Sequence, residues 1–208
     1  MKRVQRILIG AGLFAVIVLV TYLLIIRPWH LTWGATDEEL SRPMPGDEIV
    51  PNPSFNGTRA VTIEASPEDI WPWLLQMGYL RAGFYSYDSL DNKGIPSAER
   101  ILPEYQNLKV GDEIPVGEGA FVSIVSMEPN RSMLWKFQAG AWGNSTWAWG
   151  LYPEDDNHTR LITRLRIKYN WFSSSIFPML MVDVVELVMM RKCLLGIKRR
   201  VEAMCSAP

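Results

Sequence analysis

The sequence contains few of the residues on which catalytic and metal sites are usually built. Its 208 residues include only two histidines and two cysteines. His30 and His158 have no partner at catalytic or metal-ligand spacing, and metal sites need clustered ligands. The motifs of nucleophile elbows, phosphate loops, dinucleotide-binding turns and zinc proteases do not occur. The sequence therefore gives no support for nucleophilic or metal catalysis, and we expect no cofactor.

The chain also lacks an excess of charge of either sign. It has 21 basic and 22 acidic side chains, and its formal net charge is −1. A protein that binds nucleic acid needs a basic excess to neutralise phosphates. We therefore expect no nucleic-acid partner.

A disulfide between the two cysteines is excluded by their spacing. Cys193 and Cys205 fall in one C-terminal helical segment, about 18 Å apart if that helix is continuous. Cysteines at that separation cannot pair with each other. We expect two free thiols.

One long hydrophobic run is present near the N-terminus. Ile7 to Ile26 contains no charged residue. At about 1.5 Å per residue, the run is long enough to cross a hydrocarbon core of roughly 30 Å. A cleaved signal peptide is the alternative, but the run exceeds the usual length and no small-residue cleavage site follows it. The sequence predicts a basic tail over 1–6 and a single transmembrane helix over 7–26, with the lipid bilayer as its partner.

The charges that flank this run indicate its orientation. Lys2, Arg3 and Arg6 precede it, and only Arg27 and Arg42 follow closely. The side richer in Lys and Arg normally stays in the cytoplasm. We expect a single-pass membrane protein with a cytoplasmic N-terminus and its domain on the extracytoplasmic side.

Two further regions follow the span. Residues 27–58 are rich in proline, which favours extended chain, and we interpret them as a tether that lies along the domain or spaces it from the membrane. One short helical signal lies within it, with Thr36 as its cap. Residues 59–208 have the length of a single domain.

Local patterns predict the order of elements in this domain. A strand over 59–65 is followed by a helix that Ser66 caps and Gly78 ends. A short helix over 86–92 and a long loop come next. Alternating polar and apolar residues then predict five strands, and an apolar segment predicts one long helix; the strands cover 111–116, 120–127, 132–139, 145–152 and 159–169, and the helix covers 175–204.

The last strand indicates how the sheet is covered. Its apolar side chains alternate with Arg160, Arg164, Arg166 and Lys168. We expect this basic face to be solvated, so that the sheet is covered on one side only. Asp183 and Glu186 make the long helix too polar for a second span, and we expect it to lie across the covered side.

Four stretches together resemble membrane-anchored members of the SRPBCC superfamily, which includes START lipid-transfer domains and polyketide cyclases. The stretches are ASPEDIWPWLLQMG, RAGFYSYD, the Q-x-L-x-V-G-D pattern at 106–112, and MRKCLLGIKRRVE. The resemblance implies an α+β helix-grip fold, in which a curved antiparallel sheet wraps a long C-terminal helix. It also implies a hydrophobic ligand cavity, but it does not imply one reaction, because such folds host many functions.

The resemblance also suggests where a ligand would bind. In a helix-grip domain the segment after the first helix forms the rim of the cavity, and the sheet forms its wall. The candidate ligand-binding residues are therefore Gln76, Arg81, Phe84, Tyr85, Tyr87, Asp88, Trp135, Trp147 and Trp149. The alternative is structural: Tyr85 and Tyr87 cap the core, Arg81 and Asp88 form an ion pair, and the tryptophans only pack.

Three functional hypotheses follow. The first is a membrane-anchored binding protein for a hydrophobic small molecule or lipid, without covalent chemistry. The second is a polyketide cyclase-like enzyme in which Asp88, Tyr85 or Tyr87 transfers protons and Arg81 polarises a carbonyl. The third is a non-enzymatic envelope protein that presents a surface to an unknown protein partner.

Overall fold

A six-stranded antiparallel sheet forms the centre of the domain. The computed structural model of the chain describes residues 2–138, 145–168 and 176–206. Neighbouring strands follow the order β1-β6-β5-β4-β3-β2, so the first strand pairs with the last. The strands are β1 (Phe55–Ile63), β2 (Glu113–Gly117), β3 (Ala120–Glu128), β4 (Ser132–Phe137), β5 (Ser145–Pro153) and β6 (Thr159–Ile167).

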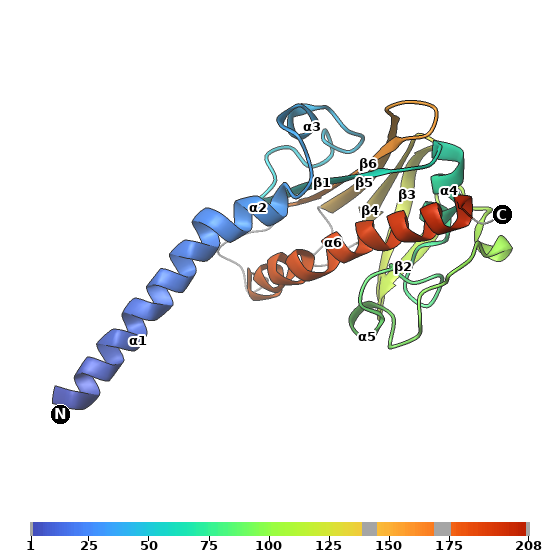
Figure 1. The fold of residues 1–208 in the computed structure, drawn as a ribbon. Coiled ribbons are helices and arrows are strands. Elements are labelled where there is room, and N and C mark those ends of the chain that lie inside the picture. Colours follow the sequence, from blue (N-terminus) through green and yellow to red (C-terminus); the bar gives the residue numbers. More distant parts are fainter. Residues whose placement is uncertain (1, 139–144, 169–175, 207–208) are drawn as a thin grey trace.

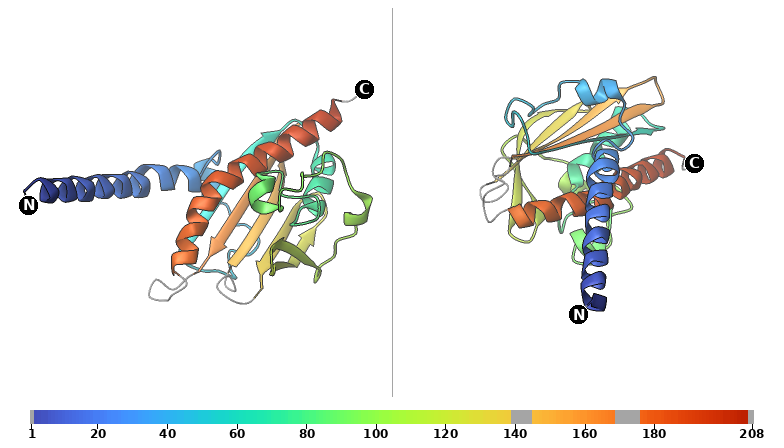
Figure 2. Two further views of the ribbon diagram at one scale, coloured as in Figure 1. Left: turned by 90° about the horizontal axis from the view of Figure 1, so that it is seen from below. Right: turned by 90° about the vertical axis from the view of Figure 1, so that its left-hand side faces the viewer.

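One long helix lies across one face of this sheet. Helix α6 (Ile176–Cys205) runs along the sheet, and α4 (Pro67–Gln76) packs near its C-terminal end. Figure 2 shows the sheet curving beneath α6. The loop after α4 carries α5 (Asp88–Asp91) and the short 3₁₀ helix η2 (Pro103–Tyr105). The predicted α+β helix-grip fold is confirmed.

The hydrophobic core fills the space between α6, α4 and the sheet. Its members include the fully buried Trp73, Trp135 and Trp149, together with Leu194 and Ile197 of α6. The alternation that predicted the strands directs every second side chain of β4, β5 and β6 into this layer. Burial of these large apolar surfaces is the main stabilising contribution to the fold.

The other face of the sheet is covered as well, which the sequence analysis did not predict. We call residues 35–50 the strap; they contain α3 (Asp37–Ser41) and lie over this face. Met44 and Ile49 of the strap pack against Ala60, Leu134 and Ile162. The expectation that one side of the sheet is solvated is therefore wrong.

The arginines of β6 hold the strap in place. Arg164, which is only 3% exposed, donates hydrogen bonds to the Asp47 carboxylate at 2.7 Å and to the Glu39 backbone carbonyl at 2.9 Å. Arg160 pairs with the Glu39 carboxylate at 2.6 Å, and Arg166 with Asp47 at 2.6 Å. Of the four basic residues that we expected to be solvated, Lys168 alone is exposed. The other three are covered because the strap supplies acceptors for their guanidinium groups.

The first strand starts earlier than predicted. It begins at Phe55 instead of Arg59, and all nine of its residues pair with β6, from Phe55 with Ile167 to Ile63 with Thr159. Asn56 and Gly57 are a local turn signal. Pairing with a neighbouring strand overrides such local preferences.

The N-terminal helix is continuous up to the domain. Helix α1 (Lys2–Thr21), the π-helical turn η1 (Tyr22–Ile26) and α2 (Arg27–Leu31) follow one another without a break, and α1 projects away from the domain (Figure 1). Residues Val4–Leu31 are long and apolar enough to cross a membrane, and an 18-residue window within them has a mean hydropathy of 2.7. The helix ends where His30 and Leu31 become buried against β1 and α6.

Charged side chains join α2 to α6 at this junction. Arg27 donates to the Asp183 carboxylate at 2.7 Å, and the His30 ring lies 3.3 Å from the same carboxylate. Arg59 of β1 pairs with Glu186 at 2.9 Å and donates to the His30 backbone carbonyl at 2.7 Å. The two carboxylates that made α6 unsuitable as a second span are thus paired within the domain.

Candidate functional site

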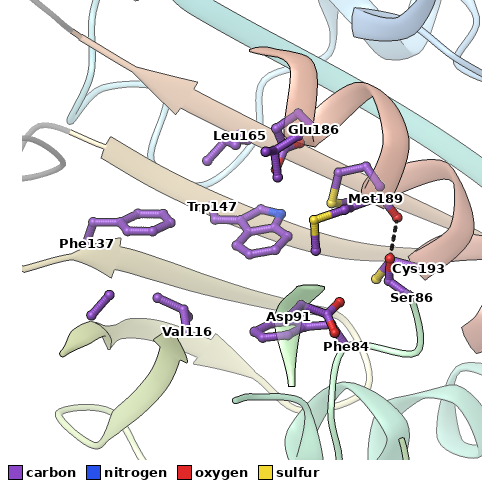
Figure 3. Close-up of a pocket in the computed structure, with 13 residues that line it drawn as sticks. Phe84, Ser86, Asp91, Val116, Phe137, Trp147, Leu165, Glu186, Met189 and Cys193 are labelled. Carbon is purple, nitrogen blue, oxygen red and sulfur yellow. Dashed lines mark hydrogen bonds between the residues drawn. The ribbon is translucent and has the colours of Figure 1, made fainter. Parts of the chain in front are cut away.

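A cavity of about 440 Å³ lies between the first half of α6, the sheet and the loop after α4. Small-molecule sites usually enclose about 300 to 1,000 Å³ and are mostly apolar. Apolar side chains form most of its wall, and few polar groups face it (Figure 3). The lining residues are Phe84, Ser86, Asp91, Val116, Ala120, Phe137, Trp147, Leu165, Val185, Glu186, Met189, Met190 and Cys193.

Trp147 presents an apolar surface at the centre of this wall. Its indole N–H donates to the Thr163 hydroxyl at 2.8 Å, so its polar atom is satisfied within the sheet. Its ring is stacked with the rings of Phe84 and Phe137, at centroid distances of 6.2 and 6.5 Å. The three rings form a continuous aromatic surface on one side of the cavity.

The other two predicted tryptophans lie behind this surface. Trp135 and Trp149 are fully buried, and their ring centroids are 5.3 and 5.0 Å from that of Trp147. Neither belongs to the cavity lining. They support Trp147 from the core and do not contact the open volume.

Gln76 and Tyr85 form a buried polar pair outside the cavity. The Gln76 amide donates to the Tyr85 hydroxyl at 3.0 Å and accepts from the Leu102 backbone N–H at 2.8 Å. The Tyr85 hydroxyl donates to the Trp73 backbone carbonyl at 3.0 Å. Burial raises the pKa of Tyr85, so the phenol stays neutral. The pair fixes the loop after α4 to α4 itself.

Asp88 also serves this loop. Tyr85 has a positive φ of 58°, a strained conformation for a residue with a side chain. The Ser97 hydroxyl accepts from the Tyr85 backbone N–H at 3.1 Å and donates to the Asp88 carboxylate at 2.5 Å. Asp88 therefore orients Ser97, which holds the strained backbone in place.

Arg81 and Tyr87 lie apart from the cavity and from each other. Arg81 donates to the Leu75 backbone carbonyl at 2.9 Å, and its guanidinium lies 4.4 Å over the Tyr105 ring at a separate polar hollow of about 320 Å³. Tyr87 is 38% exposed, with the Lys192 ammonium 3.8 Å from its ring. The structure thus brings Phe84 and Trp147 to the cavity, and it does not pair Arg81 with Asp88 or gather the acid and base candidates.

The structure adds Asp91, a site residue that the sequence analysis missed. Asp91 ends α5 and is only 8% exposed, and neither of its carboxylate oxygens has a hydrogen-bond partner among the described residues. Burial, followed by the nearby Asp88 carboxylate, raises the pKa of Asp91 to about 6. The backbone N–H of Asp91, which donates to the Tyr87 carbonyl, and the Lys192 ammonium both oppose this rise. Asp91 therefore lines a largely apolar space, and its carboxylate oxygens are covered and lack a hydrogen-bond partner among the described residues.

The other missed residues come from α6. Glu186 lines the cavity with its charge paired to Arg59; burial raises the pKa of Glu186, and Arg59 opposes the rise. Burial also raises the pKa of Cys193, which remains a neutral thiol. These α6 residues of the lining are spaced three or four positions apart, and this spacing predicts that they share one face of the helix: Glu186, Met189, Met190 and Cys193.

Comparisons with known proteins concern the fold only. No protein-family model matches the chain, and no curated protein matches its sequence. Among solved structures it is similar to a polyketide cyclase-like protein from Corynebacterium glutamicum, with 15% identity, coverage of 73% of this chain and 93% of that one, and a TM-score of 0.44. A START superfamily protein from Mycobacterium smegmatis has 14% identity, 72% and 98% coverage, and a TM-score of 0.45. An Aha1 dimer from Colwellia psychrerythraea has 15% identity, 71% and 96% coverage, and a TM-score of 0.42.

The titles of the first two structures name the two groups of proteins that the sequence resemblance includes. At these identities and TM-scores the similarities identify neither a ligand nor a reaction for this chain. Its fold is defined by its own strand order and by the long helix across the sheet.

Proposed function

We propose that the protein is a membrane-anchored binding protein that holds a hydrophobic small molecule or lipid in the cavity beneath α6. The observation that carries this proposal is a cavity of about 440 Å³ whose wall is mainly aromatic and aliphatic. An apolar space of this size in a folded domain costs stability unless something fills it. A hydrophobic ligand would recover the lost contacts and leave water for an apolar surface.

The N-terminal helix supports the membrane part of the proposal. None of the residues of its most apolar 18-residue window is buried in the domain. With the cytoplasmic N-terminus that the flanking charges favour, the domain would lie on the extracytoplasmic side. A ligand of low water solubility would then be available from the adjacent bilayer.

No observation favours the enzymatic alternative over binding. The predicted acid and base residues occupy separate contacts: Tyr85 with Trp73, Asp88 with Ser97, and Tyr87 with Lys192. A cyclase-like mechanism needs such groups within hydrogen-bond reach of one substrate. The geometry likewise identifies no protein partner for the envelope-protein alternative.

The proposal is tested by native mass spectrometry of the full chain extracted from the membranes of its host. We expect a reproducible additional mass, corresponding to one bound small molecule. Val116 lines the cavity, so Val116→Trp should fill part of the volume and remove this mass. The matched control is Val110→Trp, because Val110 is 58% exposed and lies outside the cavity lining.

Two results would contradict the proposal. One is the absence of any adduct from the wild-type chain and from the Val110→Trp control. The other is an adduct that Val116→Trp retains in full, which would place the bound molecule elsewhere, for example on the transmembrane helix.

A further inference from the structure

The buried carboxylate of Asp91 indicates which polar group a ligand of the cavity would have. Asp91 lies beside Phe84, on the side of the cavity where Ser86 and Cys193 are found (Figure 3). Both carboxylate oxygens are inaccessible to solvent and lack a hydrogen-bond partner among the described residues. Buried carboxylates are normally paired or hydrogen-bonded, because burial of a bare charge is costly.

The neighbouring groups do not supply the missing partner. Ser86, the nearest hydroxyl of the lining, donates to the Met189 backbone carbonyl at 3.1 Å. Lys192 attracts Asp91 through space, but its ammonium lies over the Tyr87 ring. The Cys193 thiol is neutral, and the Asp88 carboxylate repels Asp91. The described part of the protein therefore leaves the Asp91 carboxylate without a hydrogen-bonded or ion-paired side chain.

The charged residues of the cavity lining restrict which ligand groups could pair with the Asp91 carboxylate. Among the described residues, the lining contains the carboxylates of Asp91 and Glu186 and no lysine or arginine. Glu186 already has Arg59 as its partner at 2.9 Å. An ionised carboxylate only accepts hydrogen bonds, and it binds cationic donors most strongly. A ligand with an anionic end would meet two carboxylates and no cation.

The rest of the wall requires that the remainder of the ligand be apolar. Phe137, Trp147 and Leu165 face the open volume away from Asp91, and the indole N–H of Trp147 is already bonded to Thr163. We infer, on the basis of the proposed binding function, that the ligand is an amphiphile with a cationic amine at its polar end, and that the Asp91 carboxylate, which is covered in the ligand-free structure, turns toward the cavity and binds this amine.

The inference is tested with three probes that have the same ten-carbon chain: decylamine, decanol and decanoate. The full chain is placed in lipid nanodiscs with ¹³C-methyl-labelled methionine, and the Met189 and Met190 methyl signals report occupancy, because both residues line the cavity. Partition of the probes into lipid is the same for every variant, so affinities are compared between variants.

At pH 7.5 we expect decylamine to shift the Met189 and Met190 signals at lower concentration than decanol, and decanoate to bind most weakly. Asp91→Asn should weaken decylamine binding about tenfold or more and leave decanol binding unchanged. Asp155→Asn is the matched control, since Asp155 is an exposed carboxylate that lies outside the cavity lining. It should keep the preference for decylamine.

The pH dependence provides a second readout in the wild-type chain itself. An alkyl amine stays protonated between pH 5 and 7.5, whereas Asp91, with a pKa of about 6, becomes neutral as the pH falls. Decylamine affinity should therefore decrease from pH 7.5 to pH 5 in the wild type and stay constant in Asp91→Asn. The pH dependence of the wild type alone tests the inference even if the variant folds poorly.

The outcomes separate the two proposals. Decylamine affinity that Asp91→Asn leaves unchanged, or that does not depend on pH in the wild type, would overturn the amine assignment while the cavity remains a binding site. If none of the three probes shifts the Met189 and Met190 signals, the proposed binding function fails, and the assignment fails with it.

Discussion

Replacement of Asp91 by asparagine is expected to stabilise the ligand-free protein at neutral pH. The folded state raises the pKa of Asp91 from the ordinary value of 3.8 to about 6. At about 1.36 kcal/mol per pKa unit, the ionised carboxylate costs the folded state about 3 kcal/mol. The buried asparagine amide retains part of this cost, so we expect a net gain of about 1 to 2 kcal/mol.

The sign of the pH dependence follows from proton binding. Between pH 3.8 and about 6 the folded state keeps a proton on Asp91 that the unfolded chain has lost. Wild-type stability should therefore fall as the pH rises through this window and become constant above it. Other titrating groups cancel when the wild type is compared with Asp91→Asn. The advantage of the variant should be full at pH 8 and about 2 kcal/mol smaller at pH 4, where the variant should be no more stable than the wild type.

The measurement is urea unfolding of the full chain in a nonionic detergent, followed by tryptophan fluorescence at pH 4, 6 and 8. Asp155→Asn serves as the control, because Asp155 is an exposed carboxylate in a turn, hydrogen-bonded to His158 and to the Asn157 backbone. An Asp91→Asn variant that is no more stable than the wild type at pH 8 would refute the reasoning. So would an advantage that is the same at pH 4 and pH 8.

Three further predictions concern other parts of the chain. Arg164→Ala should destabilise the domain by about 3 to 5 kcal/mol, measured by urea unfolding, because it leaves buried acceptors of the strap without a donor; Arg131→Ala, at an exposed ion pair, should cost at most about 1 kcal/mol. Gly196→Ala should lower stability by about 1 to 3 kcal/mol, because its Cβ would lie 2.1 Å from the Tyr85 backbone oxygen. A membrane-impermeant maleimide applied to intact cells should label the exposed Cys205 if the domain is extracytoplasmic.

Matched controls make these three tests decisive. Gly12→Ala should be tolerated, since nothing lies within 4 Å of its Cβ position. Cys205→Ser should abolish maleimide labelling, whereas Cys193→Ser should not change it, because Cys193 is buried. Equal effects of Arg164→Ala and Arg131→Ala would contradict the role given to the strap contacts. Labelling of Cys205 only after permeabilisation would place the domain in the cytoplasm.

The fold could be predicted from local patterns because its elements are strongly amphipathic. The alternation in β6 predicted a strand correctly, but it could not reveal what covers the arginine face. Arg164 alternates with apolar residues in the same way whether water or another segment meets it. Its partners, Thr58 and Asp47, lie more than 100 residues away in the sequence. Such long-range contacts leave no trace in a local pattern.

The site was predicted only in part for a similar reason. The aromatic stretch after α4 was identified as special, and Phe84 does line the cavity. Asp88 and Asp91 stand three positions apart on one short helix, and the sequence does not distinguish them. Only the packed structure shows that Asp88 meets Ser97, whereas Asp91 lines the cavity and its carboxylate has no hydrogen-bond partner among the described residues. Side-chain partners, more than residue types, decide which carboxylate is available.

The continuous helix from α1 through α2 restricts the positions and orientations that the domain can adopt relative to the anchor. A domain on a flexible linker samples many heights and orientations above a bilayer, and it must lose this freedom each time it approaches the surface. Here α2 is packed against β1 and joined to α6 by the Arg27–Asp183 pair, so folding has already removed most of that freedom. The direction in which the cavity-lining half of α6 faces is thus fixed when the chain folds.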